Sequence, residues 1–204
     1  IGSVGAQGVY AIERPTRTLS TMLARAGGVT IQPEIAEITV TRGGASGKVW
    51  FQDLYNFPEL DIALRPGDRI LVEEDTRSYT AVGATGTQNK VAFKSQNLSA
   101  IEAIAQVGGL SSATADPTGV FVFRNEPAEV VGPLLGRDDL VGAQRMIYVL
   151  DLTQPNGMFV ARDFLIRDGD TVYVTEAPFT QWDKTISSFT SSLTTVSALA
   201  AFTN

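Results

Sequence analysis

The chain has 204 residues, of which 44% are hydrophobic and 19% charged, and its formal net charge is −6. This length and composition allow two domains of ordinary size, each with a buried core. The chain has neither cysteine nor histidine, which excludes a thiol nucleophile, a Ser-His-Asp triad and a zinc-finger site. The negative charge also argues against a nucleic-acid partner, because phosphate binding requires clustered Lys and Arg.

The same motifs occur twice along the chain and in the same order. They are a Val-Gly-Ala-x-Gly segment at residues 4–8 and 82–86, an apolar stretch ending in Gly-Gly at 23–28 and 104–109, and a turn followed by a strand at 65–72 and 167–174. Three pairs in one order indicate a duplicated module. We therefore expect modules at residues 1–77 and 78–177 with the same fold. Since Ile1 already lies inside the first repeat, we also expect the sequence to be a fragment or a processed product.

Each repeat is predicted to place one short helix on a small mixed sheet. In the first repeat the pattern predicts a strand at 9–12, a helix capped by Thr18 and ended by Gly27-Gly28, and strands at 38–42, 49–53 and 69–72. In the second repeat it predicts Asn97 as the N-cap, a buried stripe of Leu98, Ile101 and Ala105, and Gly108-Gly109 as the end of the helix. The fold class is therefore α+β.

The second repeat is longer than the first because of an inserted hairpin near residues 125–145. The two copies stay in register through the strands at 38–42 and 120–124 and lose it before the next pair. Residues 126–142 contain two prolines, several glycines and Asp138-Asp139. Such a segment suits a surface loop better than a core, so we expect it to project and to contact a neighbouring subunit or an axial partner.

Acidic side chains follow the last turn of each repeat. They are Asp68, Glu73, Glu74 and Asp75 in the first copy, and Asp168, Asp170 and Glu176 in the second. Paired carboxylates can bind a metal or act as acid and base on a sugar. Turn aspartates, however, usually bond their own backbone, and charges at strand ends are usually solvated. We therefore expect no catalytic, cofactor-binding or metal-binding residues, and no enzyme activity.

The last segment, residues 178–204, is predicted to form an amphipathic helix without a charged side chain from Thr185 onward. At about 100° per residue, the apolar face consists of Phe179, Trp182, Ile186, Phe189, Leu193, Val196 and Ala200. The opposite face consists of Ser187, Ser188, Ser191, Thr194 and Thr195.

This helix fits three arrangements: docking on the preceding module, a coiled-coil seam, or a membrane span. Twenty residues reach about 30 Å, the thickness of the hydrocarbon core of a bilayer. Eleven of the last twenty residues are Ser, Thr or Asn, which is too polar for a lone helix in lipid. A ring of identical helices would remove this difficulty by turning the apolar faces to lipid and the hydroxyl faces to a wet lumen.

Taken together, the motifs resemble a known family. The patterns Val-Gly-x-x-Gly-x-Tyr, Leu-x-x-x-Leu-x-x-Ala-Gly-Gly and Pro-Gly-Asp-x-Ile-x-Val look like those of the soluble-ligand-binding β-grasp (SLBB) module. Two such modules followed by a C-terminal helix resemble the outer-membrane polysaccharide export proteins, the Wza-type translocons. The second repeat departs from the pattern, with Thr87-Gln88 where the first has Val9-Tyr10.

The resemblance implies a subunit of a homo-oligomeric ring, with an octamer among the ring sizes it allows. It further implies an exported polysaccharide as cargo, an inner-membrane polysaccharide co-polymerase as partner, SLBB modules in the periplasm, and a helix in the lipid of the outer membrane. The alternative is a soluble periplasmic β-grasp protein that binds a small ligand or a glycan and docks its C-terminal helix. Oligomeric state and detergent dependence distinguish the two.

Overall fold

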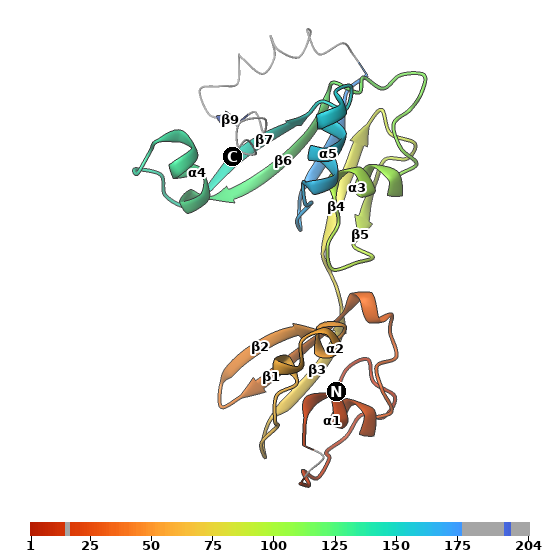
Figure 1. The fold of residues 1–204 in the computed structure, drawn as a ribbon, viewed down its shortest axis with the longest axis vertical. Coiled ribbons are helices and arrows are strands. Elements are labelled where there is room, and N and C mark those ends of the chain that lie inside the picture. The colour runs from red at the N-terminus through yellow and green to blue at the C-terminus, as the bar shows by residue number, and fades with distance from the viewer. Residues whose placement is uncertain (15–16, 177–193, 197–204) are drawn as a thin grey trace. The chain divides into compact units, whose positions relative to one another are not determined.

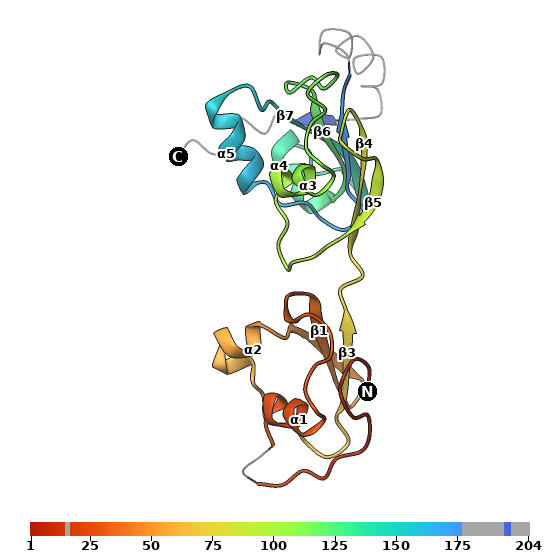
Figure 2. The same cartoon turned by 90° about the vertical axis from the view of Figure 1, so that its right-hand side faces the viewer.

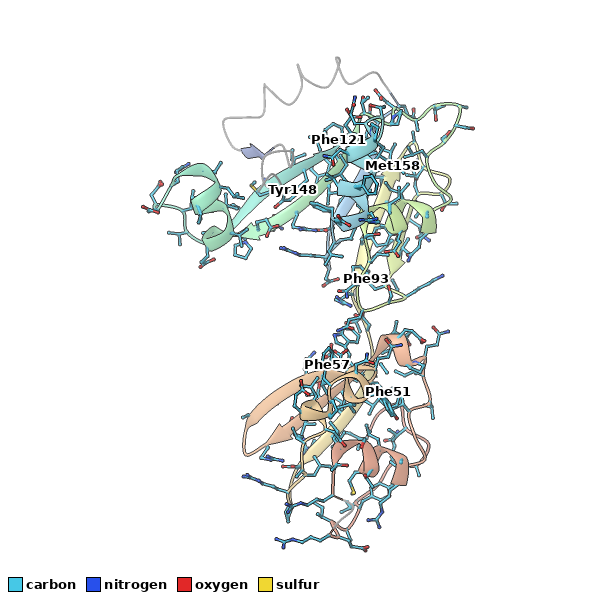
Figure 3. All side chains as sticks on the ribbon, viewed as in Figure 1. Phe51, Phe57, Phe93, Phe121, Tyr148 and Met158 are labelled. Carbon is cyan, nitrogen blue, oxygen red and sulfur yellow. The ribbon has the colours of Figure 1, made fainter. Side chains whose placement is uncertain are left out.

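The computed structural model describes residues 1–14, 17–176 and 194–196, and in it the chain divides into two compact units. Unit 1 comprises residues 1–76 together with residues 93–96, and unit 2 comprises residues 77–92 and the chain from Asn97 onward. Both units combine helices with strands, which confirms the α+β class. Residues 93–96 differ from the expected boundary. Phe93, labelled in Figure 3, is buried, and Gln96 donates a hydrogen bond of 3.1 Å to Asp53 of unit 1.

Unit 1 contains a three-stranded antiparallel sheet in the order β2-β1-β3 (Figure 1). The strands are β1 (Ala36–Arg42), β2 (Ala45–Trp50) and β3 (Arg69–Glu74). The α-helices are α1 (Leu19–Arg25) and α2 (Asp53–Asn56), and two short 3-10 helices are η1 (Pro33–Ile35) and η2 (Pro58–Leu60). The core forms where Leu19 and Leu23 of α1 pack with Ile38 of β1 and Val72 of β3.

Helix α1 begins and ends where the sequence predicts. The Thr18 side chain accepts a hydrogen bond from the amide of Thr21, and Gly27 and Gly28 follow the helix with φ angles of 80° and 77°. A glycine adopts this left-handed conformation without the steric cost that other residues meet. The strand predicted at residues 9–12 is wrong, because the structure has no strand there.

Unit 2 contains a six-stranded mixed sheet in the order β5-β4-β8-β6-β7-β9 (Figures 1 and 2). The strands are β4 (Ser78–Gly83), β5 (Asn89–Ala92), β6 (Val120–Pro127), β7 (Ala143–Leu150), β8 (Thr171–Val174) and β9 (Thr194–Val196). Strand β4 runs parallel to β8, and β9 runs parallel to β7, while the other pairs are antiparallel. The helices are α3 (Ala100–Gln106), α4 (Ala128–Leu135) and α5 (Pro155–Asp163).

Helix α3 corrects two sequence predictions. Its N-cap is Ser99 and not Asn97, because Ser99 and Glu102 form a capping box in which each side chain bonds the backbone of the other. The buried stripe accordingly contains Ala100, Ala103, Ile104 and Val107, at the i, i+3, i+4, i+7 spacing of one helical face. Ala105 was expected in this stripe and is exposed.

The same glycine contact occurs in both units at positions 81 residues apart. Gly2 has a φ angle of 89° and lies against Val72 of β3, while Gly83 has a φ angle of 89° and lies against Val174 of β8. A Cβ atom at either position would come within 2.1 Å or 2.0 Å of the carbonyl oxygen of that valine. Both positions therefore require glycine, because the backbone pairs directly with β3 in unit 1 and with β8 in unit 2 and leaves no room for a Cβ atom.

A second contact has the same spacing and fixes the register of the repeat. The Gly5 amide donates to the Gly28 carbonyl at 3.1 Å, and the Gly86 amide donates to the Gly109 carbonyl at 3.0 Å. Gly86 therefore corresponds to Gly5, whereas the sequence match of residues 4–8 with 82–86 pairs it with a different glycine. That match is wrong by three positions. It aligned similar amino acids, whereas the backbone hydrogen bonds align Gly86 with Gly5.

The C-terminal segment is described only at Thr194–Val196, which forms β9 beside β7. A strand here differs from the predicted helix, and the reason is local: Thr and Val are β-branched, and the outer edge of β7 offers backbone groups for pairing. The rest of the predicted helix, residues 178–193 and 197–204, lies outside the described residues. None of the helices within residues 1–14, 17–176 and 194–196 is both long and apolar enough to cross a membrane.

Candidate functional site: an anchored hairpin and an apolar cavity

The inserted segment of unit 2 is a long β6–β7 hairpin closed by α4. Strands β6 and β7 pair without interruption from Val120 opposite Leu150 to Pro127 opposite Ala143. Helix α4 lies at the far end of this hairpin (Figure 1). Three large apolar side chains of this end are exposed to solvent, namely Val130, Leu134 and Val141. The hairpin thus carries an apolar surface away from its base.

The base of the hairpin is fixed by Arg124 of β6. Its Nε and Nη2 atoms donate to the two carboxylate oxygens of Asp170 at 2.9 Å and 2.6 Å, and Nη2 also donates to the Leu165 carbonyl at 2.7 Å. The guanidinium lies 5.5 Å from the centre of the Tyr148 ring and 4.9 Å from that of Phe164. This bidentate pair is buried, with the Arg124 side chain 6% exposed.

Glu126 completes this cluster, which we call the hairpin anchor (Arg124, Glu126, Tyr148, Arg167 and Asp170). Its carboxylate accepts hydrogen bonds from Tyr148 at 2.8 Å, Arg124 at 3.3 Å and Arg167 at 2.7 Å. Burial acts to raise the pKa of Glu126, but the Tyr148 hydrogen bond and the two arginines outweigh it and lower that pKa. Burial, together with the bond to Glu126, raises the pKa of Tyr148 to about 12.

The burial of Glu126 corrects the sequence interpretation of the insertion. Residues 126–142 were expected to lie outside the core, yet Glu126 is 1% exposed and Val131 and Gly132 are also buried. The projecting surface is therefore confined to the exposed side chains of α4 and of the loop before β7. Tyr148 lies on β7 of the same hairpin (Figure 3). Ion pairing across the sheet, which a linear sequence does not display, holds the first residues of the insertion in the core.

Unit 1 has an equivalent pair in Arg42 and Asp68. The Arg42 Nε and Nη2 atoms donate to the Asp68 carboxylate at 2.8 Å and 2.6 Å, and Nη2 donates to the Ala63 carbonyl at 3.0 Å. The hydrogen bond from Arg42 lowers the pKa of Asp68. As expected of turn aspartates, Asp68 and Asp170 each accept a hydrogen bond from the backbone amide three residues earlier, at 2.8 Å and 2.7 Å. Their arginine partners were not predicted, and with them the two side chains are only 3% and 1% exposed. An Arg and an Asp occur in both repeats, and this recurrence was the signal in the sequence from which the pair could have been predicted.

The remaining acidic residues are not gathered into a site. Glu73, Glu74, Asp168 and Glu176 are exposed, and Asp168 accepts a hydrogen bond from the Ser78 amide at 2.8 Å. Over the described ranges, no three acidic side chains are close enough together to hold a metal ion. The acidic clusters seen in the sequence therefore separate into the two aspartates that pair with arginine, the buried Asp75, which is 8% exposed, and four exposed charges.

Unit 1 also contains an apolar cavity of about 640 Å³. One wall is α1, through Met22, Leu23 and Ala26, and another is β3, through Ile70 and Val72. The N-terminal segment, including Ile1, Val4 and residues 8–12, forms the remaining apolar wall. The turn at residues 64–69 lines one end, where the Asp68 carboxylate is already paired with Arg42. The volume lies within the range of small-molecule sites.

An SLBB domain model matches residues 78–174, which run from the start of β4 to the end of β8. The chain is 32% identical over 191 residues to the Vi polysaccharide export protein VexA/TviF of Salmonella typhi, a match that covers 93% of this chain and 52% of the relative. It is 32% identical over 168 residues to the capsule polysaccharide export protein BexD of Haemophilus influenzae, covering 79% and 43%. It is 30% identical over 172 residues to the capsule polysaccharide export outer membrane protein CtrA of Neisseria meningitidis, covering 81% and 44%. The chain spans about half the length of the curated relatives it matches.

Proposed function

We propose that this chain, an SLBB-domain protein homologous to the polysaccharide export proteins over most of its length, is a subunit of an outer-membrane conduit that exports capsular or extracellular polysaccharide from the periplasm. The observation that carries the proposal is the match to three such relatives across both units. The alternative, a soluble ligand-binding protein, has no relative of that kind among these three.

The proposed role is mechanical and involves no chemical step. Its support is the role of the buried charges. Arg42 with Asp68 ties β1 to the turn before β3, and Arg124 with Asp170 ties β6 to the turn before β8. Such bidentate pairs fix geometry. In this role the two units are building blocks of a wall around the polymer, and the net charge of −6 would limit adhesion of an acidic polysaccharide.

The proposed assembly is a homo-oligomeric ring, with an octamer among the ring sizes that the family resemblance allows, both units in the periplasm and an inner-membrane co-polymerase as partner. Support for subunit contacts comes from the hairpin, where Val130, Leu134 and Val141 are 42%, 51% and 88% exposed. Apolar side chains gathered on a projecting segment are typical of an interaction surface. The hairpin anchor holds this surface in place, so a neighbouring copy meets it without reordering.

Residues 178–204 are proposed to enter the outer membrane as an amphipathic helix within the ring. The lipid-facing residues would be Phe179, Trp182, Ile186, Phe189, Leu193, Val196 and Ala200, and the lumen-facing residues Ser187, Ser188, Ser191, Thr194 and Thr195. Support comes from the uncharged sequence after Lys184 and its two-faced pattern. Because Thr194–Val196 is a strand here, insertion requires that β9 leaves β7.

The ring is tested by particle size in detergent. We expect the full-length protein to form particles several times the monomer mass, seen by light scattering or negative-stain microscopy, and Leu134→Asp and Val141→Asp to reduce them to monomers and to stop export. Ala113→Asp, at an exposed site outside the hairpin, is the matched control and should retain both the large particles and export. A wild-type monomer that binds a glycan would favour the soluble binding protein.

The membrane helix is tested by charge placement. Phe189→Lys or Leu193→Lys would put a charge in lipid at a cost of about 2.5–3.5 kcal/mol per helix, so the protein should be lost from the outer-membrane fraction. Ser191→Lys would place the same charge in the wet lumen and should still insert while altering conduction. Equal behaviour of the two kinds of variant in fractionation and export would exclude the spanning helix and favour a docked segment.

A further inference from the structure

Both units expose large apolar side chains at the same place in the repeat. The sheet order β2-β1-β3 of unit 1 matches β7-β6-β8 of unit 2, because the strand with the paired arginine lies between two antiparallel neighbours in each. The connection from β2 to β3 contains α2, and the connection from β7 to β8 contains α5. The exposed apolar side chains of these connections include Tyr55, Phe57 and Ile62 in unit 1 and Met158, Phe159 and Leu165 in unit 2. Gathered exposed apolar groups are typical of interaction surfaces.

The exposed face of α5 has the composition of an interface core. Met158 and Phe159 precede Arg162 by four and three positions, so the three side chains lie on one side of the helix. The guanidinium of Arg162 lies 5.1 Å from the centre of the Phe159 ring. Aromatic residues, methionine and arginine are the residue types enriched at the centre of interfaces between proteins. Helix α5 packs on α3 and β7 through its other side, where Ala161 is buried.

The end of the β6–β7 hairpin is both apolar and acidic. We call residues 128–142 the hairpin tip, which exposes Val130, Leu134 and Val141. Its charged residues are Glu129, Arg137, Asp138 and Asp139, all exposed. Three acidic residues against one arginine leave the tip with a net charge of −2. The tip therefore favours an apolar surface that also offers a cation.

Charge distinguishes the surfaces on which the tip could dock. Residues 51–62 of unit 1 contain Asp53, Glu59 and Asp61 and no basic residue, so that apolar surface repels the tip. A second tip repels it as well, since both carry −2. The α5 face offers Arg162, whose present partner is Asp163, with both side chains 62% exposed. An ion pair between two such exposed groups contributes little, so Arg162 can pair with the tip at small cost.

The tip and the α5 face belong to different ends of one unit. Helix α4 joins β6 and β7 where Pro127 is opposite Ala143, whereas α5 follows the end of β7 at Leu150, and Figure 1 shows the two helices apart along the hairpin. Arg124 connects them, because it lies on β6, donates to the Leu165 carbonyl at 2.7 Å, and has its guanidinium 4.9 Å from the centre of the Phe164 ring. The two surfaces therefore keep a fixed angle within each copy.

We propose that the α5 face of unit 2 is the docking site for the hairpin tip of a neighbouring copy of this chain. The inference rests on the homo-oligomeric ring of the proposed function and names its contact. Val130, Leu134 and Val141 of one copy pack on Met158 and Phe159 of the next, and the acidic residues of the tip pair with Arg162. A contact between two different surfaces repeats from copy to copy and closes into a ring, whereas a contact of tip with tip ends at a dimer.

Crosslinking tests the contact directly, since this chain has no cysteine. Two full-length variants, Leu134→Cys and Phe159→Cys, are co-expressed with different tags and treated in detergent with a short bismaleimide, alongside the unsubstituted protein. We expect a covalent dimer that contains one chain of each kind. A single chain with both substitutions should give a ladder of larger covalent oligomers. Ala113→Cys, at an exposed site outside both surfaces, replaces Phe159→Cys in the control and should give neither product.

A second measurement examines the α5 face without crosslinking. Phe159→Asp should convert the large particles to monomers in light scattering, as Leu134→Asp does. Because Phe159 is 56% exposed, the variant should remain folded, which unchanged amide exchange of β6 and β8 would show. The same substitution at Ala113 is again the control and should leave the particles intact.

Four results would overturn the inference, and they differ in what they leave standing. Leu134→Cys that crosslinks only with itself would assign the tip to a second tip. Leu134→Cys that crosslinks with Tyr55→Cys and not with Phe159→Cys would assign it to unit 1. Large particles of folded Phe159→Asp, with monomers of Leu134→Asp, would keep the ring and place its contact elsewhere. A wild-type protein that stays monomeric in detergent would overturn the ring itself and this contact with it.

Discussion

Both units hold an arginine and an aspartate in the same bidentate pair, but they differ in what surrounds it. Arg42 of unit 1 is 36% exposed, whereas Arg124 of unit 2 is 6% exposed and has two aromatic rings and Glu126 against it. The inserted hairpin therefore does more than project, since Glu126 near the end of β6 and Tyr148 of β7 lie against Arg124, together with Phe164 after α5. We call each of these Arg–Asp pairs a clamp. The comparison indicates that the clamp stabilises a small open sheet in unit 1 and holds the base of an interaction surface in unit 2.

The largest expected difference lies in the clamps themselves. Asp170→Asn removes the bidentate charged partner of the buried Arg124, which then keeps only Glu126 at 3.3 Å, and should cost unit 2 about 3–5 kcal/mol of unfolding free energy. Asp68→Asn should cost unit 1 much less, because the Arg42 guanidinium reaches solvent. Amide exchange of β6 and β8 measures the loss in unit 2, and amide exchange of β1 and β3 measures the loss in unit 1. Losses of equal size would mean that burial does not distinguish the clamps.

A smaller difference is expected at the glycines that pair with β3 and β8. Gly83→Ala should destabilise unit 2 by about 1–3 kcal/mol, from a positive φ angle and from a Cβ atom 2.0 Å from the Val174 carbonyl. Gly109→Ala is the control, since Gly109 has a φ angle of 78° with no atom within 4 Å of an added Cβ. Gly2→Ala should cost less than Gly83→Ala, because it displaces only the three terminal residues Ile1, Gly2 and Ser3 from β3. Urea unfolding of each variant gives the values, and identical losses for Gly83→Ala and Gly109→Ala would rule out the carbonyl contact.

The hairpin anchor should give unit 2 its own pH dependence. The pKa of Glu126 is lowered in the folded state, so its ionisation stabilises the fold above the unfolded glutamate pKa of about 4.3, and this contribution is lost as pH falls through the folded value. Glu126→Gln should cost about 1–3 kcal/mol at neutral pH and flatten the acid side of the stability curve for β6 and β7. Thermal melts across the acid range test this. If the stability of Glu126→Gln varied with pH in the same way as that of the wild type, the ionisation of Glu126 would not be coupled to unfolding.

The smallest expected contrast is between the two helix caps. Ser99→Ala should cost about 1 kcal/mol, because it removes a complete capping box with Glu102. Thr18→Ala should cost less, since the Thr21 amide lies 3.5 Å from the Thr18 hydroxyl and α1 has no acidic residue in its first turn. Exchange of the first amides of α1 and α3 measures the two effects. A greater loss of stability for Thr18→Ala than for Ser99→Ala would contradict this ranking of the two caps.

Local signals in the sequence were sufficient for much of each unit. Thr18 and Gly27-Gly28 delimit α1 because capping and left-handed glycines depend on residues within one helical turn. The strands around residues 38–42 and 120–124 follow from alternating or continuous apolar patterns. The position of the hairpin near residues 125–145 followed from the loss of register between the copies. The apolar, uncharged pattern of residues 178–204 is likewise a property of the sequence.

Tertiary structure alone decided the contacts between distant residues. The pairs Arg42 with Asp68 and Arg124 with Asp170 join residues 26 and 46 positions apart, and nothing local to either residue reveals its partner. The burial of Glu126 depends on Tyr148 and Arg167, which reach it only when β6, β7 and the turn before β8 come together. The absence of a strand at residues 9–12 has the same origin, because a β-strand forms only where a neighbour offers backbone groups to pair with.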